Sequence, residues 1–265
     1  MKNLTSRLKL FAKKLNKIGI NPENFLTIRN YPLFRKQRKE WLSKNGAINK
    51  SHIILYDYEG KSGNASGHYF HQDLLVANMI FKTNPKRHVD VGSRMDGFVA
   101  HVASFREIEV LDIRPQLNSI HKNIQFRQAD LLNPHGIKKT KSLSCLHVIE
   151  HLGLGRYTDK IDIDGHIKGI ESLVGLVQEG GRLYLSFPIG LKDEVHFNAH
   201  RVLHPQTIFT IPAIANQMYL LRFDYVDDEG NLHLDSTPNE ATGKVKYGCG
   251  IYTLEKLINT YDTPK

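Results

Sequence analysis

Three aspartates end short apolar runs, and their spacing could bind a nucleoside. Asp90 lies in VDVG, Asp112 in VLDI and Asp130 in RQAD. Asp112 follows Gly92 by 20 residues, the usual distance from a glycine turn to an acid that accepts hydrogen bonds from a ribose diol. Asp130 could face an adenine edge. Gly92 and Gly97 mark a turn where a ligand can approach the backbone closely and positive φ is tolerated.

Histidines form a second group that could do chemistry. His147, Glu150 and His151 match H-x-x-E-H, a pattern in which zinc peptidases use both histidines as metal ligands. That pattern must lie inside a helix, whereas His147 ends an apolar run, so we predict no zinc-peptidase site here and assign no metal ligands. Whether a divalent cation assists the reaction is left open. Imidazole has a pKa near working pH, which suits a general base. His147 and His151 are therefore candidate bases, with His200 as a further candidate and Glu150 beside them.

Other polar and aromatic side chains gather near these histidines and could contact an acceptor. Histidine, asparagine and tyrosine side chains can hydrogen-bond to hydroxyl groups of an acceptor, and arginine can bind its carboxylate or phosphate. An ordinary structural role, in a polar loop or as a core aromatic, is the alternative for each. The candidates are His68, Tyr69, His71, Arg156, Tyr157, His196, Asn198 and Arg201.

The elements that must position these residues follow from hydrophobic periodicity. Short apolar runs alternate with stretches long enough for crossover helices, which predicts β-α-β units and a mostly parallel sheet. Ligands of such sheets bind at the carboxyl ends of the strands, where the three acids fall. Two later runs could close the sheet as an antiparallel pair. The predicted strands are 88–91, 108–113, 124–126, 142–148, 182–187, 220–226 and 247–254.

Helices are predicted at 3–18, 33–43 and 68–82, where apolar residues recur at helical spacing. The last of these follows a turn-rich loop, GKSGNASG. Its buried face is expected to consist of Tyr69, Phe70, Leu74, Ala77, Ile80 and Phe81.

Over roughly residues 68–255, the chain resembles the class I S-adenosylmethionine (SAM)-dependent methyltransferases. The motifs that carry the resemblance are, in order, VDVG, LDI, QAD, SLSCLHVIEH and GGRLYLSFP. The resemblance implies an α/β fold, with a Rossmann-like, seven-stranded, mostly parallel sheet and helices on both faces. This domain would span 61–265, after a basic helical extension at 1–60. The implied cofactor is SAM, with S-adenosylhomocysteine as product. Its implied binding residues are Asp90, Gly92, Ser93, Arg94, Gly97, Asp112, Ile113, Asp130, Leu131 and His147.

The glycine turn departs from the family pattern D-x-G-x-G-x-G. Arg94 and Asp96 stand at the second and third glycine positions, and Gly97 comes one place late. We expect a loop one residue longer, in which the Arg94 guanidinium pairs with the SAM carboxylate. Loss of SAM affinity is the alternative.

More narrowly, the chain resembles a bacterial methyltransferase-like group often associated with surface-polysaccharide genes. The segments that carry this resemblance are GHYFHQD, HVDVGSRMDGFVAH, CLHVIEHLGLGRY and FNAHR. The resemblance implies O-methylation of a sugar, a glycan or another small polar acceptor. Two alternatives stay open. One is a nucleic-acid methyltransferase, and the other is a non-catalytic SAM-fold protein that binds a partner or a glycan.

The formal charge of +9 is concentrated near the N-terminus. Residues 1–50 hold 13 Lys and Arg against two acids, whereas the rest of the chain holds 23 against 25. A basic arm on a nearly neutral body argues against nucleic acid as the partner. The basic amphipathic helix at 3–18 could instead contact an anionic membrane surface.

Composition also indicates a compartment. The chain has two cysteines and no apolar run of the roughly 18 residues that a membrane span needs. Lysine and arginine interrupt every short apolar run in residues 1–20, so no signal peptide is expected. We predict a cytoplasmic protein, with peripheral contact to the inner face of the membrane as an option. The oligomeric state is left open.

Overall fold

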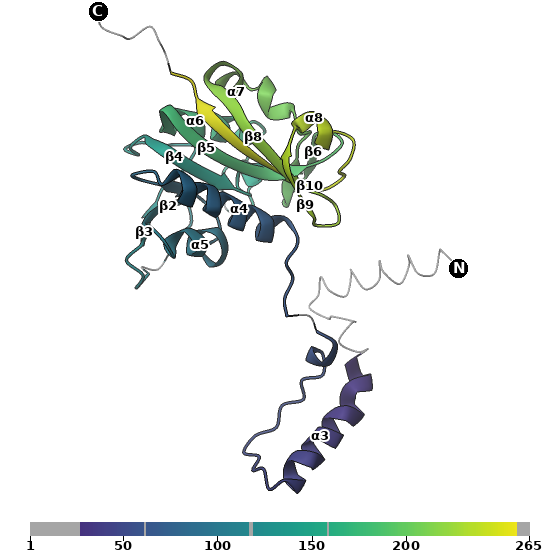
Figure 1. Ribbon diagram of the computed structural model, residues 1–265. Coiled ribbons are helices and arrows are strands. Elements are labelled where there is room, and N and C mark those ends of the chain that lie inside the picture. Colours follow the sequence, from purple (N-terminus) through teal and green to yellow (C-terminus); the bar gives the residue numbers. More distant parts are fainter. Residues whose placement is uncertain (1–26, 61, 117–118, 158, 259–265) are drawn as a thin grey trace, which may run out of the picture. The chain divides into compact units, whose positions relative to one another are not determined.

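The computed structural model describes residues 27–60, 62–116, 119–157 and 159–258, and the chain divides into two compact units, 1–64 and 65–265 (Figure 1). In the first unit, η1 (Thr27–Asn30) leads into α3 (Tyr31–Ser43), and η2 (Asp57–Glu59) follows. The helix predicted at 33–43 is thereby confirmed. No described side chain of this unit is buried. The helix predicted at 3–18 lies outside the described residues.

The second unit contains an eight-stranded mixed sheet (Figure 1). The strand order is β3-β2-β1-β4-β5-β10-β8-β9, parallel from β3 to β5 and antiparallel beyond. A separate hairpin pairs β6 with β7. The strands are β1 (Val89–Val91), β2 (Ile108–Asp112), β3 (Ile124–Gln128), β4 (Thr140–Leu146), β5 (Val177–Ile189), β6 (Glu194–His196), β7 (His200–Val202), β8 (Met218–Val226), β9 (Leu232–Ser236) and β10 (Gly248–Lys256).

This topology confirms the predicted α/β class and the antiparallel closing strands. The sheet has eight strands rather than seven, because β9 forms in the segment that the sequence reads as a polar connection. Its ladder to β8 is irregular, with a register shift between Phe223 and Tyr225. Its burial pattern lacks a fully buried position, which explains why apolar alternation does not reveal it.

Helices cover both faces of the sheet. The side chains of α4 (His68–Thr83), the π-helical turn η3 (Met95–Val99) and α5 (Ala100–Ala103) pack in one hydrophobic cluster. Those of α6 (Gly165–Leu176) and α7 (Pro212–Gln217) pack in a second cluster. The remaining short helices are η4 (Ile149–His151), η5 (Thr207–Thr210) and α8 (Pro238–Ala241).

Two expected crossover helices do not form. The connections from β2 to β3 and from β3 to β4 contain no helix in their described residues. Pro115 and Pro134 lie within these connections, and a proline in a helix interior removes one backbone hydrogen bond and clashes with the preceding turn. In the described residues of the parallel part of the sheet, helices lie in the connections from β1 to β2 and from β4 to β5.

The buried face of α4 differs from the predicted one. Its buried residues are Gln72, Asp73, Val76, Ala77 and Ile80. The side chains predicted to be buried but found exposed are Tyr69, Phe70, Leu74 and Phe81. Two polar residues can occupy the core because the Gln72 amide oxygen accepts from Ser186 Oγ at 2.5 Å and its nitrogen donates to Asp73 at 3.1 Å. Such partners remove most of the cost of burying polar groups.

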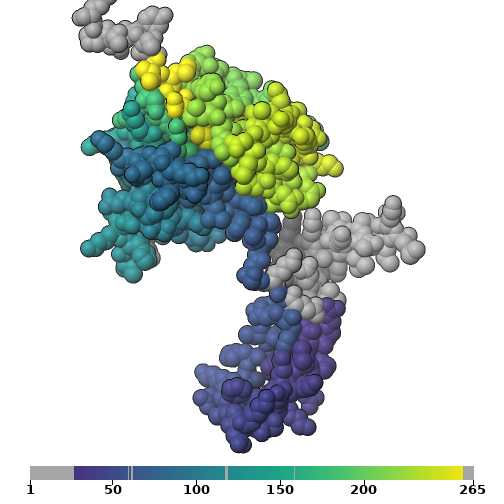
Figure 2. All heavy atoms as spheres, in the orientation of Figure 1, coloured from purple at the N-terminus to yellow at the C-terminus, as the bar shows by residue number. Residues whose placement is uncertain are grey.

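In space-filling form, the late residues of the second unit, coloured green to yellow, lie together beside the blue residues of α4 (Figure 2). Within the described ranges, no helix is long and apolar enough to cross a membrane.

Candidate functional site

A cavity of about 510 Å³ opens at the carboxyl ends of β1, β2, β3 and β4. Its volume is typical of sites for small molecules, which range over roughly 300–1,000 Å³. The strand order reverses between β1 and β4, the place where open parallel sheets bind ligands. Eight residues singled out from the sequence line it: Gly92, Asp112, Ile113, Asp130, Leu131, His147, His151 and Tyr157.

The turn after β1 is fixed by a buried acid. Gly92 has φ +70°, and a Cβ there would lie 3.0 Å from the Val148 side chain, so the position requires glycine. Asp90 is fully buried and accepts hydrogen bonds from Ser93 N at 3.0 Å, Ser93 Oγ at 2.7 Å and Ser144 Oγ at 2.5 Å. Burial raises the pKa of Asp90 to about 6. Asp90 and Ser93 therefore shape the turn and do not line the cavity.

The next residues of the turn differ from the expected arrangement. Arg94, expected to pair with a cofactor carboxylate, pairs with Asp96 at 2.8 and 3.1 Å, and its guanidinium lies 5.1 Å from the Tyr69 ring centre. Ser93 and Arg94 line a second hollow of about 300 Å³, which shares Asp112 with the main cavity. Gly97 has φ −124° rather than positive φ. Position 97 nevertheless requires glycine, because a Cβ there would lie 2.5 Å from Asp73 Oδ2.

The predicted ribose acid lies in the cavity, but its carboxylate is engaged. The Arg114 guanidinium donates to both Asp112 oxygens, at 3.0 and 2.5 Å, and stacks 4.9 Å from the Tyr157 ring centre. A ribose diol at Asp112 must therefore share this carboxylate with Arg114 or displace it. Asp130 accepts from Leu132 N at 2.9 Å, which holds the loop after β3 along the cavity.

A cluster of imidazole rings lies at the ends of β4 and β5. His68 stacks on His147 with ring centres 5.4 Å apart. His200 contacts His151 at 6.5 Å and Tyr247 at 5.3 Å, and Tyr247 contacts His68 at 5.4 Å. We call these four histidines and Tyr247 the imidazole cluster. His147 and His151 also line the cavity, so the cluster and the cavity are continuous.

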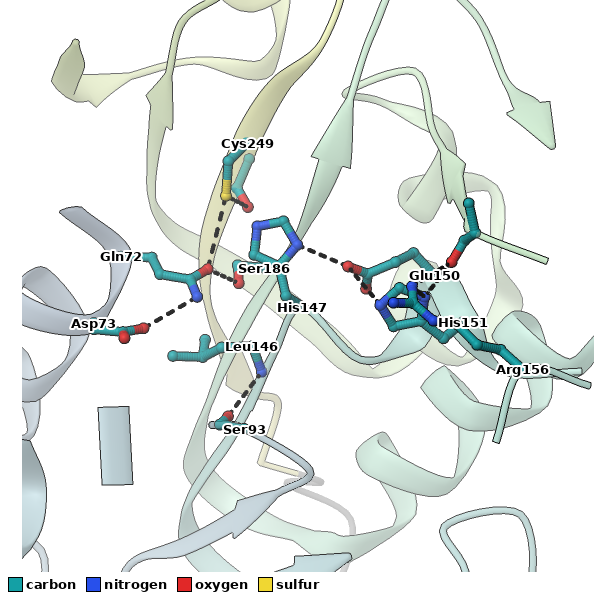
Figure 3. Close-up of polar contacts among 12 residues, drawn as sticks. Gln72, Asp73, Ser93, Leu146, His147, Glu150, His151, Arg156, Ser186 and Cys249 are labelled. Atoms are coloured by element: carbon teal, nitrogen blue, oxygen red, sulfur yellow. Dashed lines mark hydrogen bonds and ion pairs between the residues drawn. The ribbon is translucent and has the colours of Figure 1, made fainter. Parts of the chain in front are cut away.

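Glu150 lies between His147 and His151 of this cluster (Figure 3). Its side chain is 1% exposed and accepts from His147 Nδ1 at 2.7 Å, while His151 Nε2 lies 3.8 Å away. Burial opposes a charge on His147, but the neighbouring Cys249 and Glu150 raise the pKa of His147 above its usual value. His147 also has φ +55°, a strained backbone conformation that concentrates at functional sites.

His151 and His200 have the opposite electrostatic character. Burial lowers the pKa of both side chains, and the neighbouring His196 lowers that of His200 further. His151 Nδ1 donates to the Ala199 carbonyl at 2.7 Å, which leaves Nε2 as a proton acceptor. Burial also lowers the pKa of His68 to about 4, and the charge of His147 adds to the effect. His68, His151 and His200 are therefore neutral near pH 7.

The arginines predicted to contact an acceptor make backbone contacts instead. Arg201 is buried and donates to the carbonyls of Leu152 at 2.6 Å and Ile163 at 3.1 Å, which ties two loops together. Arg156 donates to the Ala199 carbonyl at 2.9 Å beside His151. Arg201 is thus structural, and Arg156 stands at the edge of the imidazole cluster.

The other predicted acceptor residues are spread more widely. Tyr69 packs on His147 with ring centres 4.9 Å apart. His196 contacts His200 and pairs with Glu194 on the exposed β6–β7 hairpin. Asn198 is exposed at the hairpin turn with φ +59°. The only ring contact found for His71 in the described structure is with Phe70, outside the imidazole cluster.

The structure adds site residues that the sequence did not single out. Arg114 stands two residues after Asp112, and this spacing could have indicated an ion pair between the two side chains. Asp159 accepts from Gly153 N at 2.8 Å and from Tyr157 N at 3.1 Å, and it lines the cavity. Cys249 and Tyr247 come from the region of β10, and no local pattern pointed to them.

Comparison with solved structures identifies the class of fold. A protein from Galdieria sulphuraria assigned as a sarcosine dimethylglycine methyltransferase aligns with a TM-score of 0.50 at 12% identity, covering 70% of this chain and 84% of that one. The N-methyltransferase NodS of Bradyrhizobium japonicum, in complex with S-adenosylhomocysteine, gives 0.48 at 11%, covering 78% and 93%. A SAM-dependent methyltransferase of Clostridium acetobutylicum gives 0.46 at 13%, covering 77% and 95%. The alignment with the Galdieria protein, together with the strand order of the sheet, shows a methyltransferase-like Rossmann fold.

A family model places the chain more narrowly. The family described as "Caenorhabditis protein of unknown function, DUF268" matches residues 101–233, half of the chain, and the chain belongs to this family. That range includes Asp112, Asp130 and the histidines from His147 to His200. No curated protein matches the chain.

Proposed function

We propose that this protein is a SAM-dependent methyltransferase acting on a hydroxyl of a small polar acceptor such as a sugar. The observation that carries the proposal is the continuity of two surfaces, because His147 and His151 belong to both the cavity and the imidazole cluster. A cofactor in the cavity and an acceptor against the cluster would be neighbours. Aligning two reactants in this way can supply much of the acceleration of a group transfer.

The residues of the cavity suit SAM. Gly92 leaves its backbone accessible, Asp112 offers a carboxylate to a ribose, and the loop after Asp130 forms the wall near an adenine. When bound, SAM supplies an activated methyl group on a sulfonium. Arg114 would release at least one Asp112 oxygen to the ribose and keep its contact with Tyr157.

His151 is the candidate general base that the electrostatics favour. It is neutral near pH 7 because burial lowers its pKa, and its Nδ1 is fixed by the Ala199 carbonyl. Nε2 can then accept the proton of an acceptor hydroxyl. His147, whose pKa is raised beside Glu150, is better suited to donating a hydrogen bond.

The acceptor class rests on the chemistry of the imidazole cluster. Imidazole nitrogens and the hydroxyls of Tyr69 and Tyr247 offer many hydrogen bonds at one end of the cavity, which suits a polyol. We therefore propose a sugar hydroxyl, in the context of surface-polysaccharide synthesis, as the methylated group. A nucleic acid fits less well, because residues 51–265 carry 23 basic against 25 acidic side chains.

Calorimetric titration of the full chain with SAM and with S-adenosylhomocysteine tests the cofactor assignment. We expect both to bind. Asp112→Ala should weaken binding by about 1–3 kcal/mol, or roughly 5- to 150-fold, because ribose hydroxyls lose a buried partner. Glu107→Ala, which removes an exposed acid just before β2, is the matched control and should leave the affinity unchanged.

Absence of binding by either compound would reject the methyltransferase proposal and leave a non-catalytic SAM-fold protein. Binding that Asp112→Ala does not weaken would place the ribose elsewhere. If SAM binds, release of S-adenosylhomocysteine from SAM in the presence of hydroxylated sugars would identify the acceptor class.

A further inference from the structure

Three potential metal ligands meet at the centre of the imidazole cluster. One donor atom each from His68, His147 and Cys249 lies within 4.8 Å of the others. They come from the start of α4, the end of β4 and the beginning of β10. Cys249 is fully buried, and the side chain of His147 is 5% exposed.

The orientation of His147 is that of a metal ligand. Its Nδ1 donates to Glu150 at 2.7 Å, and its ring lies between Glu150 and Cys249 (Figure 3). Its Nε2 is buried and has no hydrogen-bond partner among the described residues. Histidines that bind metals commonly donate their second ring N–H to a carboxylate in this way, which fixes the ring and leaves the other nitrogen for the metal.

We propose that His68, His147 and Cys249 bind one zinc-type divalent cation, with the fourth position left for water or an acceptor oxygen. Two imidazoles and a thiolate form a borderline-soft ligand set that suits Zn²⁺ and not Mg²⁺ or Ca²⁺. Three protein ligands with an open fourth position are typical of catalytic zinc sites.

The required adjustment is small. Ligand atoms in a tetrahedral zinc site lie roughly 3.5 Å apart, given metal–ligand distances of about 2.0–2.3 Å. The three donors must therefore approach one another by about 1 Å. His68 can make this adjustment by rotating its side chain, because it is the first residue of α4 and its ring already stacks on the ring of His147.

Coordination has a defined proton balance. The Cys249 thiol gives its proton to solvent and binds as a thiolate. His147, whose pKa is raised in the metal-free site, also releases one ring proton to solvent, so both histidines bind as neutral imidazoles. The divalent cation and its three protein ligands then carry a single net positive charge. The cation would act as a Lewis acid that lowers the pKa of a bound hydroxyl. That catalytic role depends on the proposed methyltransferase function, whereas metal binding itself does not.

Cobalt titration of the full chain, first stripped of metal with a chelator, tests the site. We expect a thiolate-to-cobalt charge-transfer band in the near ultraviolet, saturating at one equivalent and displaced by Zn²⁺. Cys249→Ala should abolish the band. Cys145→Ala, which alters the other buried cysteine, should retain it.

His68→Gln is the second variant, and it changes a side chain at a helix start rather than in the core. His68→Gln should weaken cobalt binding by at least about 10- to 100-fold. That is the loss commonly seen when a residue that hydrogen-bonds to a metal ligand is removed, and loss of a ligand itself should cost no less. No band in the wild type, or a band unchanged in both Cys249→Ala and His68→Gln, would overturn the proposal. SAM titration of the same stripped chain separates the two proposals, because SAM binding without cobalt binding would reject the metal site alone.

Discussion

At the scale of single residues, a buried hydrogen-bond chain supports the turn that lines the cavity. His88 lies 2.8 Å from Ser142 Oγ and 3.1 Å from Ser144 Oγ, and Ser144 donates to Asp90 at 2.5 Å. Asp90 in turn holds Ser93. A fully connected buried chain of this kind rigidifies its surroundings, so the protonation of His88 bears on the stability of the whole unit.

The effect of His88 on stability should depend on pH. Burial, together with the charge of Arg106, lowers the pKa of His88 from 6.5 to about 3. The unfolded chain therefore takes up this proton first, and the native state loses stability as pH falls below 6.5. His88→Gln lacks this proton uptake, so its free energy of unfolding relative to the wild type should rise by about 2 kcal/mol between pH 6.5 and about pH 5.

Urea denaturation of both proteins at several pH values measures this difference. Equal m-values would show that the two proteins unfold to the same extent. A difference in free energy that stays constant with pH would contradict the assignment of a buried, neutral His88.

At the scale of elements, α4 links the sheet to the imidazole cluster. Its first residue, His68, reaches the cluster, and its buried side carries Gln72 and Asp73 beneath the glycine turn. Val76 and Ile80 continue this side into the hydrophobic core. The orientation of the helix about its axis therefore decides which residues reach the site.

A pair of truncations in α4 tests that orientation. Val76 is fully buried, whereas Leu74 is 42% exposed although the sequence predicts it to be buried. Val76→Ala should lower the free energy of unfolding by about 2–3 kcal/mol, because it removes buried methyl groups and leaves a cavity. Leu74→Ala removes more atoms but should cost about 1 kcal/mol or less.

Thermal and chemical denaturation of the two variants gives the comparison. The opposite ranking, with Leu74→Ala the more destabilising, would mean that α4 packs through the face predicted from its apolar residues.

At the scale of the whole molecule, the chain separates a basic arm from a nearly neutral body. Residues 1–50, the arm, hold the entire excess of Lys and Arg over Asp and Glu, and the helix predicted at 3–18 lies outside the described residues. The body contains the cavity and the imidazole cluster. We propose that the arm brings the protein to an anionic membrane surface, where a lipid-linked glycan would serve as the acceptor of the proposed reaction.

Flotation with liposomes tests this role of the arm. The full chain should float with vesicles that contain anionic lipid more than a chain lacking residues 1–20 does. The difference should shrink as salt is raised, because exposed charges are screened. Equal flotation of the two chains would reject the membrane proposal, and vesicles without anionic lipid serve as the control.

The sequence by itself determined the α/β class and the edge of the sheet where the site lies. Apolar runs are local patterns, and the carboxyl ends of parallel strands share one edge, so Asp112, Asp130 and His147 could be placed together without coordinates. The same local reasoning missed β9 and predicted the wrong face of α4, because it could not see which polar residues find buried partners.

Only the tertiary structure decided what each polar group does. The sequence predicts that Asp90 binds the cofactor and Arg201 the acceptor. In the structure both side chains form hydrogen bonds within the protein instead. His68, His147 and Cys249 meet although they are far apart in the chain. Such contacts depend on helix rotation, strand order and burial, and these arise from packing across the whole unit rather than from local residue order.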